Sequence, residues 1–490
     1  MKKSLAALAA LLLLTLPLSA CFGRPSKPDR TDTDEPVTIP PITVPTEPDD
    51  RTFTDTTAYT DRLETLFATS DPTPEEDFAY EPCEGGVRIT AYKGGDSVVV
   101  IPDTLGDAPV VAIGEGAFAD LAGIKAVSVP DSVVSMGRGA FKGCGSMTSL
   151  RTPVFTCEGA PFFGALFGAE SYETNGSAVP AGLSTLVVTR GGAEVSVPDY
   201  AFYACRGLEV VFLPESLTAV GNFAFYGCQS LVQIPLGGTS LAAVGQHAFT
   251  GCGELLTLEI PTTAKSLGFA MLEGCGKLEA LTLPFVGGFA ADYVLSDEEA
   301  AAVEKGTMQA PAATAYLGYL FGAADYTFTA GYLPASLITV TLLEGCGDIP
   351  ANAFFECASV REIVIPEGVT SIGRRAFYGC ERLAAVILPD SVTAVGDDAY
   401  HGCLRLTSFA GGAGLTDLGV QVFMDCVSLS TVTLPMGVTH LPNACFAGCV
   451  SLETLTAKGV LTLGKQVFRH CDKLAGTSWV PRPTQPAVTE

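Results

Sequence analysis

Cysteine is the residue type in this sequence whose spacing first suggests chemistry. Six cysteines near the C-terminus follow one another at intervals of 23, 23, 23, 23 and 22 residues: Cys357, Cys380, Cys403, Cys426, Cys449 and Cys471. Cysteines at fixed spacing can bind zinc, form disulfides or act as nucleophiles. Structural zinc sites need paired C-x-x-C motifs, and the sequence has no such spacing. One cysteine per period indicates instead that each occupies the same place in a repeated unit.

Five more cysteines share this place in the motif, and we call all eleven the repeat cysteines; the five are Cys144, Cys205, Cys228, Cys252 and Cys275. In a secreted protein, disulfides would be the usual expectation. Equivalent atoms of stacked repeats lie about 4.8 Å apart, but their side chains run parallel, and cysteine also suits a small buried apolar site. We therefore predict a column of free, unreactive thiols. The remaining cysteines are Cys21, Cys83, Cys157, Cys346 and Cys445.

The other residues that could do chemistry do not assemble into a catalytic motif. The four histidines, His247, His401, His440 and His470, fall at different positions of the repeat. The sequence has no G-x-S-x-G, H-E-x-x-H or P-loop motif. We assign no catalytic residue, no metal site and no cofactor, and we predict that the protein is not an enzyme.

The repeated unit that positions the cysteines is clearest in Val360–Cys380 (VREIVIPEGVTSIGRRAFYGC) and again in Leu383–Cys403. A strand of the form L-x-x-V-x-(L/I)-P ends at proline, which has no N–H for the next hydrogen bond. A second short extended piece closes on a glycine, as at Gly221, Gly373 and Gly396, which we expect in a positive-φ conformation or a tight corner. The segment A-F-x-G-C then predicts one helical or 3-10 turn. A period of about 23 residues predicts a solenoid.

A bulky residue lies three positions before each repeat cysteine or its equivalent. One such residue per repeat, always at the same position, predicts a stack of side chains inside the solenoid, and a ligand-binding role for this set is improbable. The set comprises Phe118, Phe141, Phe202, Phe225, Phe249, Leu272, Phe354, Phe377, Tyr400, Phe423, Phe446 and Phe468.

Two stretches interrupt the period, at about 145–185 and 285–340. Cys144 and Cys205 are 61 residues apart, and Cys275 and Cys357 are 82 apart. The segments Phe162–Tyr172 and Tyr316–Tyr326 share a motif, F/Y-x-G-x-L-F-G-A-x-x-Y, and indicate longer variant repeats. We expect a short helix in PFFGALFGA and an exposed helix at 297–305. Their aromatic residues could form a binding site or pack on their own repeats, and packing is favoured because inserted apolar groups are usually buried.

The N-terminal segment, residues 1–20, has two lysines followed by an apolar run too short to span a bilayer, as in a secretory signal. Leu18-Ser19-Ala20-Cys21 resembles the lipobox of bacterial lipoproteins, which implies lipid on Cys21. Residues 21–77 are rich in Pro, Thr and Asp and predict a disordered stalk. The repeat array covers 78–475, with two strands around Lys93-Gly94-Gly95 as its cap, and 476–490 is a Pro-rich tail. A formal net charge of −25 argues against a nucleic-acid partner.

The repeat, with Ser391–Gly396 (SVTAVG) and Ala376–Cys380 (AFYGC), resembles the BspA-like leucine-rich repeats of bacterial surface proteins over roughly residues 85–474. The resemblance implies a leucine-rich repeat solenoid, conventionally classed as α/β, with short parallel strands. It also implies a non-enzymatic protein at the extracellular face of the membrane. Some members of the family are implicated in adhesion to host matrix proteins, coaggregation or host recognition.

Strand residues between the inward positions would form a continuous outer face suited to a large partner rather than a small molecule. Taken with this face, the resemblance implies an adhesion or recognition protein that binds a host or bacterial surface protein or glycan. A structural envelope scaffold without a specific ligand is the alternative. The candidate binding residues are Lys125, Glu209, Phe212, Glu259, Thr282, Arg361, Glu362, Ile387 and Thr433.

Overall fold

The computed structural model describes residue 67 and residues 71–157, 159–189, 195–306, 308–457 and 461–474. The predicted signal segment, Cys21, most of the stalk and the C-terminal tail lie outside these residues. Those regions therefore remain predictions from sequence.

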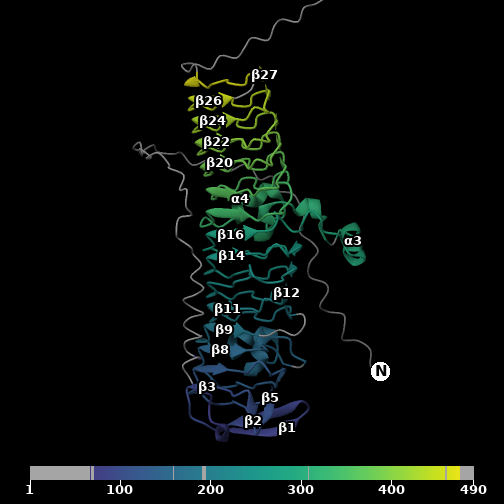
Figure 1. The fold of residues 1–490 in the computed structure, drawn as a ribbon, viewed down its shortest axis with the longest axis vertical. Helices are drawn as coiled ribbons and strands as arrows, with labels where there is room; N and C mark the ends of the chain where they lie inside the picture. Colours follow the sequence, from purple (N-terminus) through teal and green to yellow (C-terminus); the bar gives the residue numbers. More distant parts are fainter. Residues whose placement is uncertain are drawn as a thin grey trace, which may run out of the picture. The chain divides into compact units, whose positions relative to one another are not determined.

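The described chain winds into stacked coils, and the first strand of each coil, which in most coils runs up to a proline, lies in a parallel ladder made of three hydrogen-bonded sheets (Figure 1). We call these strands the proline-ended strands. Successive inward residues pair in register, for example Leu281 with Val340 and Val340 with Ile363. The coil carrying Gln233 joins the ladder through one bridge to Val210. The strands are β3 (Val98–Val100), β6 (Ala126–Ser128), β8 (Ser149–Thr152), β9 (Thr185–Val188), β11 (Val210–Phe212), β14 (Thr257–Glu259), β16 (Ala280–Leu283), β17 (Thr339–Leu342), β18 (Glu362–Val364), β20 (Ala385–Ile387), β22 (Ser408–Ala410), β24 (Thr431–Leu434) and β26 (Thr454–Ala457).

A second series of parallel strands follows the turns, and most of its members have two to four residues. Between Phe289, bridged to Ser266, and Ile349, bridged to Ile372, no further strand of this series is present in the described residues. The strands are β2 (Gly86–Tyr92), β5 (Ala108–Ile113), β7 (Ser135–Met136), β10 (Val195–Val197), β12 (Leu217–Val220), β13 (Ala243–Val244), β15 (Ser266–Leu267), β19 (Ser371–Ile372), β21 (Ala394–Val395), β23 (Asp417–Leu418), β25 (His440–Leu441) and β27 (Thr462–Leu463).

The A-F-x-G-C segments form consecutive turns, so the predicted helical turn is wrong for the regular coils. The N–H of Phe225 donates to the carbonyl of Ala248 in the next coil at 2.8 Å, and Gly227 donates likewise to Thr250. The N–H of Cys228 instead closes a turn onto Phe225. N–H groups of this segment thus alternate between partners in the next coil and partners in the same turn. Left-handed residues such as Phe223 (φ 55°) and Gly227 (φ 71°) make this possible, because a helix would direct every N–H along its own axis. We call the surface formed by these turns the turn face.

The glycine that ends each second strand does not adopt a positive φ, contrary to one of the two expectations. The φ angle is not positive at Gly221, Gly373 or Gly396. The residue with a positive φ lies two positions later, for example Arg375 after Gly373 and Asp398 after Gly396. A Cβ on Gly396 would lie 2.7 Å from the amide nitrogen of Arg374 in the preceding coil. Close approach of two backbones therefore explains the glycine.

The N-terminal end is closed by an antiparallel hairpin of β1 (Phe78–Cys83) and β2, preceded by the 3-10 helix η1 (Glu75–Asp77). A second antiparallel contact joins β4 (Thr104–Leu105) to β5. The sequence analysis predicted the cap around Lys93-Gly94-Gly95. Strands do flank that segment, but β2 and β3 belong to different ladders, so the pairing partner that caps the solenoid is β1.

The predicted internal stack of bulky residues is confirmed. Ring centroids of Phe354, Phe377 and Tyr400 are 5.3 and 5.0 Å apart with nearly parallel planes, and the stack continues through Phe423 and Phe446. All five residues are buried. The coils are therefore held together by apolar stacking inside and backbone hydrogen bonds at the walls.

The two variant repeats have the same local structure, as their shared motif predicted. Each replaces the regular turn by a 3-10 helix, a second short 3-10 helix and one α-helical turn. The first 3-10 helix of each ends at a left-handed glycine, Gly168 (φ 87°) or Gly322 (φ 96°). The elements are η2 (Phe163–Phe167), η3 (Tyr172–Thr174) and α2 (Asn175–Ala178), then η5 (Leu317–Phe321), η6 (Tyr326–Phe328) and α4 (Thr329–Tyr332).

The second variant repeat also carries the predicted exposed helix, α3 (Asp297–Glu304), which stands away from the stacked strands in Figure 1. Ser296 and Glu299 form a reciprocal capping box at its N-terminus, which satisfies backbone N–H groups that have no partner within the helix. The 3-10 helix η4 (Pro311–Thr314) returns the chain to the stack. No residue of α3 is buried.

Candidate functional site

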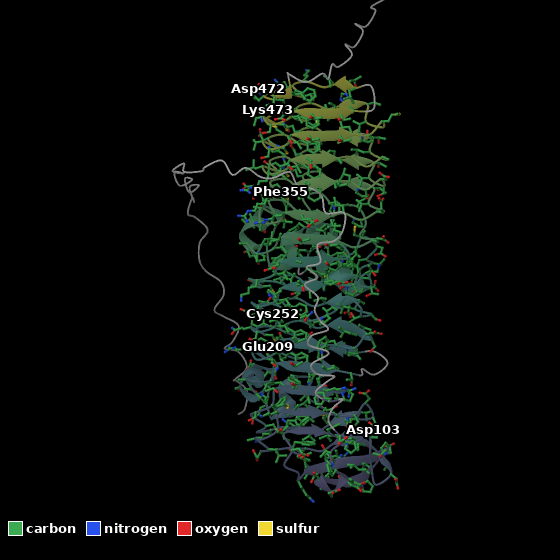
Figure 2. The ribbon with its side chains drawn as sticks, turned by 60° about the vertical axis from the view of Figure 1, so that its left-hand side comes forward. Asp103, Glu209, Cys252, Phe355, Asp472 and Lys473 are labelled. Atoms are coloured by element: carbon green, nitrogen blue, oxygen red, sulfur yellow. The ribbon has the colours of Figure 1, made fainter. Side chains whose placement is uncertain are left out.

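The strand face is the surface made by the outward residues of the proline-ended strands. In each strand, inward and outward side chains alternate, so Val432 is buried while Thr431 on one side of it is exposed. The residues of neighbouring strands lie opposite one another, as Thr431 does to Thr454. The face thus presents parallel rows of side chains along the array, some of which can be seen in Figure 2 beside Glu209.

The structure places the nine predicted binding residues on or beside this face, but it does not gather them into one site. Lys125 precedes β6 and Glu209 precedes β11, so several coils separate them. Glu259 and Thr282 lie opposite each other on β14 and β16. Ile387 and Thr433 are separated by one coil, at Ala410. Phe212, Thr282 and Thr433 are half-buried, and the other six residues are exposed.

Three of the predicted residues do converge. Arg361, Glu362 and Ile387 belong to two adjacent coils and are all exposed. The residues between and beside them include two apolar side chains that the sequence analysis did not select, Ile338 and Val364. We call Ile338, Arg361, Glu362, Val364 and Ile387 the central strand patch.

Three of the five side chains of the central strand patch are apolar and exposed. Ile387 is 65% exposed, Val364 41% and Ile338 37%. The backbone N–H of Arg361 donates to the carbonyl of Ile338 at 2.8 Å, so these two residues lie in neighbouring coils. A signal for Val364 was present in the sequence, because it is a large apolar residue between the two inward residues Ile363 and Ile365.

The aromatic residues of the variant repeats mostly pack inside the array. Phe163, Phe167, Tyr316, Tyr319 and Phe321 are all buried. The Asn175 side chain, itself fully buried, accepts from the N–H of Gly164 at 2.9 Å and donates to the carbonyl of Ala201 at 3.1 Å. The packing interpretation is therefore correct for these residues. Two aromatic residues, Phe328 (59% exposed) and Tyr332 (46%), remain at the surface of the second variant repeat.

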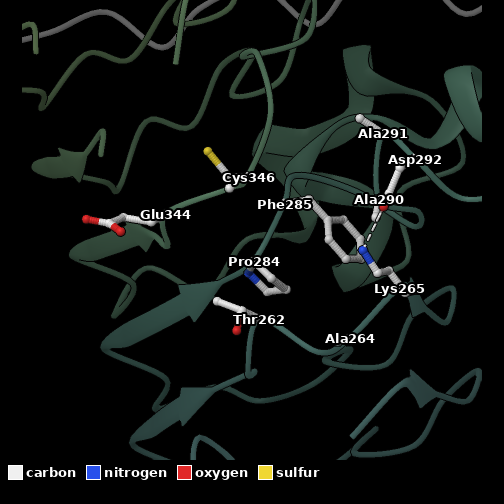
Figure 3. Close-up of a pocket in the computed structure, with 11 residues that line it drawn as sticks. Thr262, Ala264, Lys265, Pro284, Phe285, Ala290, Ala291, Asp292, Glu344 and Cys346 are labelled. Atoms are coloured by element: carbon white, nitrogen blue, oxygen red, sulfur yellow. Dashed lines mark hydrogen bonds and ion pairs between the residues drawn. The ribbon is translucent and has the colours of Figure 1, made fainter. Parts of the chain in front are cut away.

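A cavity of about 260 Å³ lies where the second series of strands is interrupted, between Phe285 and Cys346 (Figure 3). Lys265 donates to both carboxylate oxygens of Asp292, at 2.9 and 3.1 Å, which holds the pKa of Asp292 below its ordinary value. Burial raises the pKa of Cys346 to about 11. Because the charges of Lys265 and Asp292 satisfy each other and the thiol is protonated near neutral pH, we assign this cavity no chemistry.

The repeat cysteines of the described residues are free and buried, as predicted. Nine of their thiols donate a hydrogen bond to the carbonyl of the stacked aromatic residue in the preceding coil, at 2.9–3.4 Å: Cys144, Cys228, Cys252, Cys275, Cys380, Cys403, Cys426, Cys449 and Cys471. Cys205 and Cys357, which each follow a variant repeat, make no such bond within the described part of the chain. Burial raises the pKa of Cys228 and of Cys380 to about 12, which keeps both thiols protonated and unreactive.

Three of the four histidines contact acidic side chains or threonine hydroxyls, as His247 contacts Thr250 at 3.2 Å, and within the described residues no histidine is hydrogen-bonded to a serine or a cysteine. His401 lies 3.4 Å from Asp398 and 3.7 Å from Asp425, and His247 lies 3.6 Å from Glu273. His440 contacts the hydroxyl of Thr462. Across the described ranges, no group of three or more His, Cys, Asp or Glu side chains is arranged to hold a metal ion.

The family is decided by a match to the model for the BspA type leucine-rich repeat region, in six copies, over residues 99–158, 195–289 and 347–475. These stretches make up more than half of the chain. The chain belongs to the BspA-type leucine-rich repeat family. The unmatched intervals coincide with the two variant repeats of this BspA-type protein.

Solved structures similar to this BspA-type protein include bacterial leucine-rich repeat proteins. One from Bacteroides ovatus is 19% identical over 81% of this chain and 79% of that chain, with a TM-score of 0.31. A leucine rich cell surface protein from Faecalibacterium prausnitzii is 22% identical over 80% and 96%, with a TM-score of 0.33. The pneumococcal vaccine antigen PcpA is 16% identical over 78% and 85%, with a TM-score of 0.25. No curated protein matches the chain. Within the described residues, no helix is both long and apolar enough to traverse a bilayer.

Proposed function

We propose that this BspA-type protein is a recognition or adhesion protein, anchored by lipid at Cys21 to the extracellular face of a bacterial membrane. In this proposal its strand face binds a protein or glycan on a host or bacterial surface. The central strand patch is the observation that carries the proposal. Three large apolar side chains exposed beside an arginine and a glutamate have the composition of a binding surface rather than of a solvated wall.

The binding part of the proposal is tested with the full chain in a solid-phase assay. The immobilised probes are extracellular matrix proteins, mucin, whole bacterial cells and purified wall glycan. We expect saturable binding to one of these classes. The double variant Val364→Asp/Ile387→Asp should lower the binding affinity by about tenfold or more, because complex formation would bury two unpaired carboxylates in the interface.

The matched control is Val134→Asp/Val294→Asp, which adds the same charge at exposed valines outside the strand face. It should bind as the wild type does. Equal loss in both variants would contradict a role for the strand face. Absence of binding to every probe by the folded wild type would favour the scaffold alternative.

The anchor is tested separately by Cys21→Ser. We expect the wild-type protein to partition into detergent with a mass increased by lipid, and the variant to lose both properties. Membrane retention of the variant without any lipid on the wild-type chain would contradict the anchor.

A further inference from the structure

A cleft of about 400 Å³ opens on the turn face of the C-terminal half and shares no lining residue with the cavity between Phe285 and Cys346. It extends from Ala330 of α4 across four successive coils to Asp425. None of the residues that line it belongs to the strand face. The function proposed above therefore does not account for it.

The floor of the cleft follows from the left-handed backbone position that precedes each repeat cysteine. In the two central coils this position is glycine, Gly379 (φ 69°) and Gly402 (φ 72°), which leaves no side chain above the backbone. In the two flanking coils the same position carries Glu356 (φ 52°) and Asp425 (φ 58°). The floor of the cleft therefore contains two glycines, with the Glu356 side chain lying against Gly379 and with Asp425 in the last of these coils, next to Gly448.

Part of the lining is aromatic, since it includes Tyr378 and His401. Tyr378 stacks on Phe355 with centroids 5.0 Å apart and lies 4.8 Å from the ring of His401. The guanidinium of Arg375 lies 5.8 Å from the centre of the Tyr378 ring and bonds to Asp398 at 3.4 Å. Since neighbours already occupy the faces of the Tyr378 ring, the ring offers a ligand its edge and its hydroxyl oxygen.

The rest of the lining combines charge with an apolar surface. Glu381 and Leu404, which is 39% exposed, follow their repeat cysteines directly. Burial, reinforced by the nearby charge of Glu381, raises the pKa of Glu356. Within the described residues neither glutamate forms an ion pair, and the arginines that follow Glu381 and Leu404, Arg382 and Arg405, pair with neither. Asp425 by contrast lies 3.7 Å from His401.

We propose that this cleft binds an organic cation that carries N–H groups, an ammonium or guanidinium on an apolar stem. Glu356 and Glu381 accept its hydrogen bonds and balance its charge, the hydroxyl of Tyr378 accepts a further one, and Leu404 packs against the stem. A quaternary ammonium ion is a poor ligand, because it has no N–H to donate and the ring faces that would attract it are occupied.

The test is calorimetric titration of the full chain at about 150 mM salt, which weakens general attraction to an acidic protein. The probes are spermidine, a hexalysine peptide and tetramethylammonium. We expect Glu356→Gln/Glu381→Gln to weaken binding of the first two by about tenfold or more, and tetramethylammonium to bind at least about tenfold more weakly than spermidine. Preference for hexalysine would identify a basic polypeptide as the source of the cation, and preference for spermidine a free polyamine.

The matched control is Glu298→Gln/Glu304→Gln on α3, which removes the same charge from exposed positions and should change binding by less than about twofold. Leu404→Lys is a second variant, expected to abolish binding because its own ammonium would occupy the cleft. The strand-face variant Val364→Asp/Ile387→Asp should bind these probes normally, so the two proposals fail independently. Equal weakening in both glutamine variants, or no binding by the wild type, would overturn the proposal.

Discussion

The hydroxyl of Tyr400 is buried, and no described residue offers it a hydrogen bond. Tyr400 replaces the phenylalanine of other coils in the internal stack, where its ring packs between Phe377 and Phe423. The ring thus stabilises the stack while its hydroxyl is desolvated without compensation. The ring of Tyr400 therefore contributes to the stability of the stack, whereas its hydroxyl does not.

Tyr400→Phe should therefore stabilise the C-terminal coils by about 1–3 kcal/mol, the usual penalty of an unsatisfied buried polar group. The measurement is amide hydrogen exchange at Ala399–Cys403, because arrays can unfold locally. Slower exchange is expected, and faster exchange would show that the hydroxyl has a partner that stabilises the fold.

Phe377→Ala should act in the opposite direction, by about 3–5 kcal/mol, because it leaves a cavity between two stacked rings. Tyr378→Ala, which removes a half-buried ring on the turn face, is the control and should destabilise the same coils less. Exchange rates at the amides of both neighbouring coils measure the difference. A larger effect at Tyr378 would contradict the assignment of the internal stack.

The buried thiols should make the array sensitive to alkaline pH. Thiols of the unfolded chain ionise near pH 8.5, whereas burial raises the pKa of Cys144 and of Cys471 to about 11. Below a pH of about 8.5 these thiols are protonated in both the folded and the unfolded state. Between about 8.5 and about 11 only the unfolded state loses protons, so stability falls by about 1.4 kcal/mol per pH unit for each thiol.

Urea unfolding midpoints between pH 7 and pH 10.5 measure this effect, with the range chosen to bracket the ordinary thiol pKa. Cys380→Ala/Cys403→Ala is the comparison and should show a shallower decline, since two titrating thiols are absent. Alkylation by iodoacetamide should also be slow until the protein unfolds. Rapid modification of the native repeat cysteines at neutral pH would contradict their burial.

At the scale of the structural element, the turn between the second strand and the internal stack depends on close backbone contact. Gly396 donates to the carbonyl of Ile372 at 2.8 Å and lies against Arg374 and the carbonyl carbon of Gly373. A side chain has no room there, because the opposing atoms are backbone rather than flexible side chain.

Gly396→Ala should destabilise its coil by about 1–3 kcal/mol, the range for overpacking. Gly253→Ala is the control, since a Cβ there has no neighbour within 4 Å. Its effect should be near zero or slightly stabilising. Thermal unfolding of both variants compares them directly, and equal melting temperatures would show that the backbone separates easily at Gly396.

At the scale of the whole array, continuity depends on the proline-ended strands. The second series of strands is interrupted at the second variant repeat, but β16 and β17 pair over four residues at the same level, from Ala280 with Thr339 to Leu283 with Leu342. The same interval contains α3, which contributes no buried residue.

Limited trypsin digestion should consequently cleave after Lys305, the exposed C-cap of α3, before it cleaves within the coils. The two fragments should remain associated in gel filtration, because the strand pairing and the apolar core cross the cut. Separation of the fragments without denaturant would contradict a continuous core. Lys305→Gln should remove this first cleavage without changing stability.

The sequence by itself determined the solenoid, its period, the internal aromatic stack, the free thiols and the equivalence of the two variant repeats. Each of these follows from local periodicity, because every coil repeats the same inward residues. Only the tertiary structure decided what depends on contacts between coils. It showed that the A-F-x-G-C segments form turns, because several of their N–H groups donate to carbonyls of the next coil. It also showed that glycine is required at position 396 because the backbone of the preceding coil lies so close.

The candidate surfaces divide in the same way. The alternation of strand residues was sufficient to place Glu362 and Ile387 outward, whereas Arg361 precedes β18 and is exposed at the start of that strand. That these residues form one patch with Ile338 and Val364 could be seen only from the register between neighbouring coils. The cleft on the turn face was not foreseeable, because Glu356 and Glu381 lie 25 residues apart in sequence and come together only through stacking.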